Sequence, residues 1–133
     1  MIFVDTSAFI ALIDLQNRFS KPARYWWQKN KSVELITTNL IIIETLGWIR
    51  YKCGKKIAVE AGNSLLFSHD IQIERVTLTN EQKAWALFQE LQGRGISMID
   101  CTSFILMKRL KIKDAFTFDS DFKKQGFTVY PGI

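Results

Sequence analysis

Hydrophobic positions along the chain fall into two alternating kinds of segment. Short runs of β-branched and aromatic residues predict strands, and the longer stretches between them carry apolar residues three or four positions apart, which is typical of helices. The predicted strands are residues 2–5, 33–37, 71–76, 115–118 and 127–130. Strands that alternate with helices favour a parallel sheet covered on both faces. We therefore expect an α/β protein with three layers (α/β/α) and a parallel sheet of about five strands.

Residues typical of helix ends support this division of the chain. Ser20 followed by Lys21 and Pro22 predicts a cap with proline in the first turn, and Thr79 with Gln82 three residues later predicts a capping box. Ser97 is the expected cap of the helix that carries Asp100. The predicted helix ends are Gly54, for the helix that begins near Asn39, and Gly93 with Gly95, for the helix that begins after Thr79.

Length and composition agree with one compact domain over residues 1–133. The chain is 47% hydrophobic, which is enough for one sizeable core. No apolar run approaches the roughly 18 to 20 residues of a membrane span, and the start of the chain lacks a signal-peptide pattern, so we expect a cytoplasmic protein without a membrane partner. The 18 Lys and Arg against 13 Asp and Glu give a net charge of +5, which permits attraction to a nucleic acid. Neither of the two cysteines has the spacing of a zinc site.

Acidic residues stand at the predicted carboxyl ends of strands. Open parallel sheets bind ligands beyond these ends, where the order of the strands reverses. Asp5 ends the first predicted strand, and Asp119 follows the strand at 115–118. If these two strands are neighbours, the two carboxylates meet, although either residue is also a plausible helix cap.

Two further acids lie in largely apolar helical segments. Glu44 has Leu40, Ile41 and Trp48 among its neighbours on the helix, so no polar stripe would carry it toward water. Asp100 lies in the first turn of its predicted helix, where an acid also complements the helix dipole without any further role. The unusual position of Glu44 favours a functional site over a structural one.

Four carboxylates at one edge of a sheet call for a cation, because they would otherwise repel one another. Oxygen ligands select hard ions, so Mg²⁺ or Mn²⁺ is expected rather than zinc, as one ion or two. Two such ions would clamp the attacking and leaving oxygens of a phosphodiester. The only histidine, His69, offers no pair for metal-free acid–base cleavage, and the sequence contains no GxxxxGK[ST] or GxGxxG loop.

The combination of DTS at 5–7, Glu44, Asp100 and TFDSDF at 117–122 resembles the PIN-domain nucleases. The compact size and the DTSAFIALI opening are most similar to the VapC-type toxins of toxin–antitoxin pairs. This resemblance implies a PIN-like, Rossmann-like fold and a quartet that binds Mg²⁺ or Mn²⁺, made of Asp5, Glu44, Asp100 and Asp119. It also implies supporting hydroxyl groups that orient ligands, at Thr6, Ser7 and Thr117. Asp121 is an alternative fourth acid.

The expected function is metal-dependent endonucleolytic hydrolysis of RNA, as the toxin of a toxin–antitoxin pair. The resemblance implies three partners: an RNA substrate, a cognate antitoxin and a second copy of the chain in a homodimer. Two alternatives remain open at this point. One is a housekeeping PIN nuclease that processes RNA, and the other is a non-catalytic module that binds RNA or a protein partner on the same fold.

Overall fold

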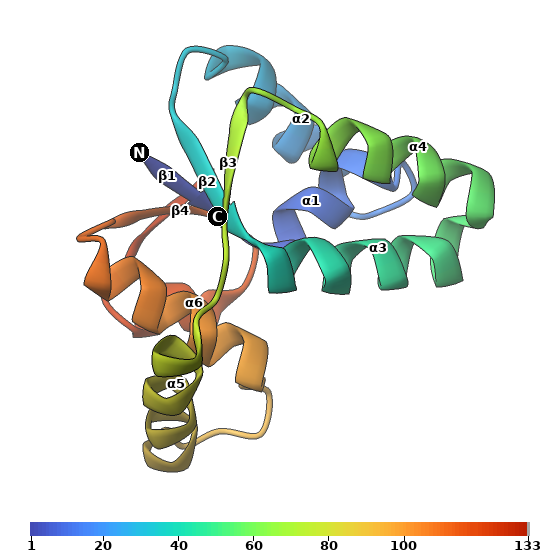
Figure 1. Ribbon diagram of the computed structural model, residues 1–133. Helices are drawn as coiled ribbons and strands as arrows, with labels where there is room; N and C mark the ends of the chain where they lie inside the picture. Colours follow the sequence, from blue (N-terminus) through green and yellow to red (C-terminus); the bar gives the residue numbers. More distant parts are fainter. Residues whose placement is uncertain (133) are drawn as a thin grey trace.

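Five parallel strands form one sheet at the centre of the molecule (Figure 1). The computed structural model describes residues 1–132, so the predicted domain boundary at residue 133 lies outside the described part. The strand order is β3-β2-β1-β4-β5. The strand bounds are β1 Ile2–Val4, β2 Leu35–Thr38, β3 Ile71–Glu74, β4 Asp114–Phe116 and β5 Thr128–Tyr130. All five predicted strands are confirmed, and their ends differ from the predicted ones by at most two residues.

Helices occupy both sides of this sheet. The helix bounds are α1 Thr6–Ile13, α2 Ser20–Lys29, α3 Asn39–Cys53, α4 Lys55–Leu66, α5 Leu78–Glu90, α6 Met98–Arg109 and α7 Ser120–Lys124. In Figure 1, α1, α3 and α4 pack together on the right of the sheet, whereas α5 and α6 form a separate pair at the lower left. The predicted three-layer α/β/α fold is therefore confirmed.

The core consists of aromatic and aliphatic side chains from both faces of the central strands. Phe3 of β1 contacts Phe122 of α7, which in turn packs edge-on against Phe104 of α6. On the opposite face, Phe116 of β4 lies against Trp26 of α2, with ring centroids 4.3 Å apart. Successive residues of a strand point to opposite faces of the sheet, and residues in register on neighbouring strands share a face. Both β1 and β4 therefore contribute side chains to the core on each face. Each such buried ring stabilises the fold by about 1.5 to 3 kcal/mol.

Two predicted helix starts are wrong by one or two residues. The helix α2 begins at Ser20 itself, so Ser20 is helical rather than the cap, and no side chain caps this end. The helix α5 begins at Leu78, because the side chain of Thr77 accepts the backbone N–H of Asn80. Thr79 is therefore the second residue of α5 and not its cap.

Two other predicted helix boundaries, at Gly54 and Ser97, agree with the structure. Gly54 follows α3 and has a φ of 92°, a conformation that favours glycine. Ser97 caps α6 in a reciprocal capping box with Asp100. The predicted end of α5 at Gly93 with Gly95 is wrong, because α5 ends at Glu90 and Leu91 is its C-cap. None of the helices within residues 1–132 is both long and apolar enough to cross a membrane.

Candidate active site

The strand order brings the residues that follow β1 and β4 together. These strands pair in parallel, with Val4 opposite Phe116, and the N–H of Asp5 donates to the carbonyl oxygen of Phe116 over 3.1 Å. The chain moves outward from β1 through β2 to β3 and then returns to the other side of β1, so the order reverses between β1 and β4. The expected switch point is confirmed, and this is where open parallel sheets bind ligands.

Asp5 is the buried centre of a network of hydroxyl groups. It caps α1, and its Oδ2 atom accepts hydrogen bonds from Ser7 Oγ and Thr117 Oγ1, each over 2.9 Å. Burial, together with the carboxylates of Asp100 and Asp119, raises the pKa of Asp5 to about 7 in spite of these donors. Asp5 therefore carries a charge that the protein alone does not fully compensate.

The same hydroxyl groups fix the turn between β4 and α7. Thr117 Oγ1 accepts the N–H of Asp119 over 3.0 Å, and Ser7 Oγ accepts the N–H of Phe118 over 2.9 Å. The two hydroxyl oxygens lie 3.1 Å apart. Ser7 and Thr117 thus connect the start of α1 to the turn that carries Asp119.

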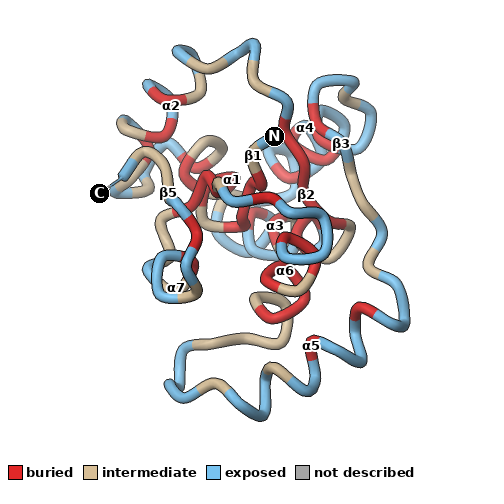
Figure 2. Tube along the Cα trace, turned by 90° about the vertical axis from the view of Figure 1, so that its left-hand side faces the viewer, coloured by how far each residue is buried: buried red, intermediate tan, exposed pale blue. Residues whose placement is uncertain are grey.

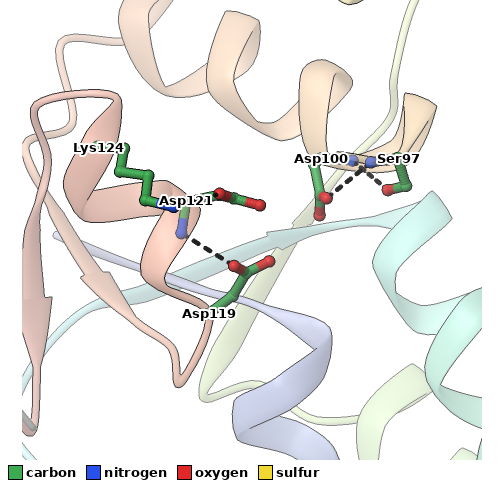
Figure 3. Close-up of polar contacts among 5 residues, drawn as sticks. All are labelled: Ser97, Asp100, Asp119, Asp121 and Lys124. Atoms are coloured by element: carbon green, nitrogen blue, oxygen red, sulfur yellow. Dashed lines mark hydrogen bonds and ion pairs between the residues drawn. The ribbon is translucent and has the colours of Figure 1, made fainter. Parts of the chain in front are cut away.

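Three carboxylates point toward one another across the edge of the sheet (Figure 3). One oxygen from each of Asp100, Asp119 and Asp121 lies within 4.8 Å of the other two. Asp100 comes from the first turn of α6, where its Oδ2 accepts the N–H of Ser97 over 2.9 Å. Asp119 caps α7 and accepts the N–H of Asp121 over 2.9 Å.

The charges of these acids oppose one another. Burial, together with the carboxylates of Asp119 and Glu44, raises the pKa of Asp100 to about 6. Burial also raises the pKa of Asp119, with a further contribution from Asp121. Within residues 1–132 the only ion pair is that of Asp121 with the largely exposed Lys124, at 3.7 Å. The cluster is therefore short of positive charge.

Glu44 reaches the site from the other side of the sheet. It lies half-buried on α3, and the hydroxyl of Thr6 on α1 donates a hydrogen bond to its Oε1 atom. Its charge contributes to the raised pKa of Asp100, although its carboxylate, like that of Asp5, lies outside the closest group of three. Thr6 therefore fixes the position of the acid that the apolar helix pattern singled out.

Asp121 is the acid that the sequence placed least clearly. The structure assigns the cap to Asp119 and brings Asp121 into the same cluster. The sequence signal for this arrangement is the DSD motif at 119–121. An acid two residues after a cap lies in the first turn of the helix, close to the capping side chain.

The donor set suits a hard divalent cation. All candidate ligands are carboxylate or hydroxyl oxygens, which favour Mg²⁺ or Mn²⁺ over softer metals. A cation would also relieve the repulsion that, after burial, contributes to the raised pKa values of Asp5, Asp100 and Asp119. The residues present thus fit a divalent metal site.

Comparison with known families and proteins identifies the family of this chain. The sequence profile of the PIN domain matches residues 2–127. The chain belongs to the PIN-domain family, which confirms the resemblance drawn from its acidic residues.

Among the most similar proteins is the 23S rRNA-specific endonuclease VapC20 of Mycobacterium tuberculosis, found in two strains. It is 34% identical to this chain over 127 residues, which cover 96% of this chain and 95% of VapC20. The crystal structure of M. tuberculosis VapC20, described as a sarcin–ricin loop cleaving toxin, superposes with a TM-score of 0.89 at 32% identity, covering 96% of this chain and 97% of that one. FitAcB from Neisseria gonorrhoeae shares the fold, with a TM-score of 0.67 at 14% identity over 99% of this chain and 98% of that one.

Proposed function

We propose that this PIN-domain protein is a divalent-metal-dependent endoribonuclease and the toxin of a toxin–antitoxin pair. The observation that carries the proposal is the convergence of Asp100, Asp119 and Asp121 beyond the strand ends, next to the buried Asp5. Membership of the PIN-domain family and the similarity to VapC20, an rRNA endonuclease, support the same activity.

Each acid has a distinct part in the proposed site. Asp5, Asp100 and Asp119 hold Mg²⁺ or Mn²⁺, with Glu44 completing the quartet and Asp121 as the alternative to Asp119. When bound, a divalent cation lowers the pKa of a coordinated water and stabilises the charge on phosphodiester oxygens.

The hydroxyl groups hold these acids in place. The hydroxyl groups of Ser7 and Thr117 keep the Asp5 carboxylate in one orientation, since both donate to its Oδ2 atom. The hydroxyl of Thr6 holds Glu44 in the same way. Groups of this kind outside the ligand set commonly tune metal affinity.

The proposed substrate is RNA, and the proposed place of action is the cytoplasm. The net charge of +5 favours a polyanion. The similarity to VapC20 makes a sarcin–ricin loop RNA the first substrate to test.

The test is cleavage of that RNA by purified protein. We expect cutting with Mg²⁺ or Mn²⁺, none with EDTA, and none by Asp5→Asn or Asp100→Asn, while the matched control Asp70→Asn, which alters an exposed acid outside the site, cuts normally. Full activity of the Asp5 and Asp100 variants would falsify the proposed site. Tight RNA binding by the wild type without any cleavage would favour a non-catalytic RNA-binding module.

The proposed partner is an antitoxin that covers the acidic site. A groove of about 570 Å³ lies beside α1, lined by apolar residues such as Phe9, Trp27 and Leu65, with Glu60 and Asp70 also on its walls. The helix α1 begins at the acids and continues into this groove. One apolar helix of the antitoxin, with a basic side chain, would therefore contact both the groove and the acids. Co-purification with the product of an adjacent small reading frame tests this partner, and absence of such a frame would favour a housekeeping RNA-processing nuclease.

A homodimer is the second proposed assembly. Two exposed aromatic pairs support it, Trp48 with Tyr51 on α3 and Trp85 with Phe88 on α5. Exposed apolar groups of this size commonly mark contact surfaces. Light scattering on the purified protein should give twice the mass of one chain.

A further inference from the structure

A second cavity lies between the beginning of α5 and the end of α6. It has a volume of about 410 Å³, and its walls carry three cations, Lys83, Lys108 and Arg109. Lys108 follows Asp100 by eight residues on α6, which at about 1.5 Å per residue separates them by about 12 Å along the helix axis. The acidic site and this basic cavity are therefore separate places on one helix.

The beginning of α5 adds hydrogen-bond donors to the cavity. The side chain of Thr77 accepts the N–H of Asn80, and its carbonyl oxygen accepts the N–H of Glu81. This leaves the N–H groups of Leu78 and Thr79 without a protein partner among the described residues. Free N–H groups at the positive end of a 13-residue helix favour an anion.

Asn80 supplies a hydrogen-bond acceptor on the wall of the same cavity. Its side chain is only 2% exposed, and its Nδ2 atom donates to the carbonyl oxygen of Thr102 over 3.1 Å. Its Oδ1 atom has no hydrogen-bond partner in the described part of the chain. A buried acceptor without a partner is costly and uncommon, so a donor from outside the chain is expected at this point.

The cavity thus combines cations and free N–H groups for an anion with an acceptor for a hydroxyl donor. Phosphodiester oxygens meet the first requirement, and the ribose 2′-hydroxyl, which DNA lacks, meets the second. Figure 2 shows that α5 is exposed along most of its length, so an extended strand has access to this side of the molecule.

We propose that this cavity binds the ribose-phosphate backbone of the RNA substrate, a few nucleotides from the bond that is cut. The proposal rests on the proposed ribonuclease function. At about 3.4 Å per nucleotide in a stacked strand, the separation of about 12 Å corresponds to three or four nucleotides. The site positions the RNA and takes no part in the chemical step.

The first test measures RNA binding by the double variant Lys83→Ala/Lys108→Ala. The matched control is Lys29→Ala/Lys31→Ala, which removes the same charge at the end of α2 and just beyond it. Fluorescence anisotropy with a labelled single-stranded RNA in EDTA prevents cleavage and gives Kd at several salt concentrations. We expect the cavity variant to bind roughly tenfold more weakly, with a salt slope smaller by about 1.4, because each lost phosphate contact removes about 0.7.

The outcomes separate this inference from the proposed function. Wild-type protein that neither binds nor cuts RNA would overturn both. If the wild type binds and cuts RNA but the cavity variant behaves like the control variant, the inference is wrong and the ribonuclease function stands. Melting curves for both double variants check that the substitutions, which alter exposed side chains, leave the fold intact.

A second test addresses the hydroxyl contact directly. Single 2′-deoxy substitutions are introduced one at a time on both sides of the cut bond. We expect one position, three or four nucleotides away, at which the substitution weakens binding several-fold to the wild type but not to Lys83→Ala/Lys108→Ala. Equal effects on both proteins at every position would show that the cavity does not read the ribose.

Discussion

The hydroxyl of Thr117 donates a 2.9 Å hydrogen bond to the carboxylate of Asp5, 112 residues earlier in the chain. The same oxygen accepts the backbone N–H of Asp119 over 3.0 Å. One threonine therefore fixes the distance between an acid that follows β1 and an acid that follows β4.

Removal of this hydroxyl should weaken the metal site without removing an acid. We expect Thr117→Val to lower metal affinity or the rate of RNA cleavage by about 10- to 100-fold, as is typical of groups that orient metal ligands. Initial cleavage rates over a range of Mn²⁺ concentrations measure both quantities. Thr117→Ser keeps the hydroxyl and should retain most activity, whereas an equal loss in both variants would point to a packing role for the methyl group.

Burial of Asp5 should make the stability of the metal-free protein depend on pH. Its pKa is about 7 in the folded protein against an ordinary value of 3.8, so the folded state keeps a proton that the unfolded state has released. The stabilisation from Asp5 is therefore complete below about pH 4 and is lost as the pH rises to 7. At about 1.4 kcal/mol per pKa unit, the loss is on the order of 4 kcal/mol.

Asp5→Asn removes this titration and isolates the effect. Urea unfolding in EDTA should give similar free energies for both proteins near pH 4, and a more stable variant near pH 7.5. A wild-type protein that gains stability relative to Asp5→Asn as the pH rises would contradict the assignment.

Divalent cations should stabilise the folded protein through the acidic cluster. A ligand at 100 times its Kd adds about 2.7 kcal/mol to the free energy of unfolding, which raises the melting temperature by several degrees. We expect this increase with Mn²⁺ for the wild type and for Asp70→Asn, and little of it for Asp100→Asn. An increase of the same size in all three proteins would place the bound ion elsewhere.

The two neighbouring acids at the start of α7 should differ in importance. Asp119 contributes to the raised pKa values of both Asp5 and Asp100, whereas the charge of Asp121 is partly offset by Lys124. We therefore expect Asp119→Asn to reduce RNA cleavage by at least 100-fold and Asp121→Asn by about tenfold. Single-turnover rates at saturating Mn²⁺ measure the difference, and the reverse order would make Asp121 the direct ligand.

The strand pattern predicted the sheet because hydrophobic periodicity is a local property of the sequence. Residues 2–5 and 115–118 were recognisable as strands, and the alternation with helices then limited the sheet to a parallel arrangement. Glu44 was recognisable because a charge without polar neighbours on a helix is unusual.

Details that depend on contacts between distant segments were not predictable in the same way. Thr77 and Thr79 are equally good caps by residue type, and the bond of Asn80 to Thr102 on α6 is a contact that no local pattern reveals. The place of Asp121 in the cluster likewise depends on how α7 packs, as does the approach of Thr117 to Asp5.

The pairing of β1 with β4 also sets the time at which the proposed nuclease becomes active during its synthesis. Asp5 leaves the ribosome early, but Thr117 follows 112 residues later, which takes about 6 to 22 seconds at about 5 to 20 residues per second. Until then β1 has no partner on that side, and the acids of α7 are not yet made. A growing chain therefore lacks the complete proposed site until most of its residues have been made, so the proposed nuclease can act only when its own synthesis is almost finished.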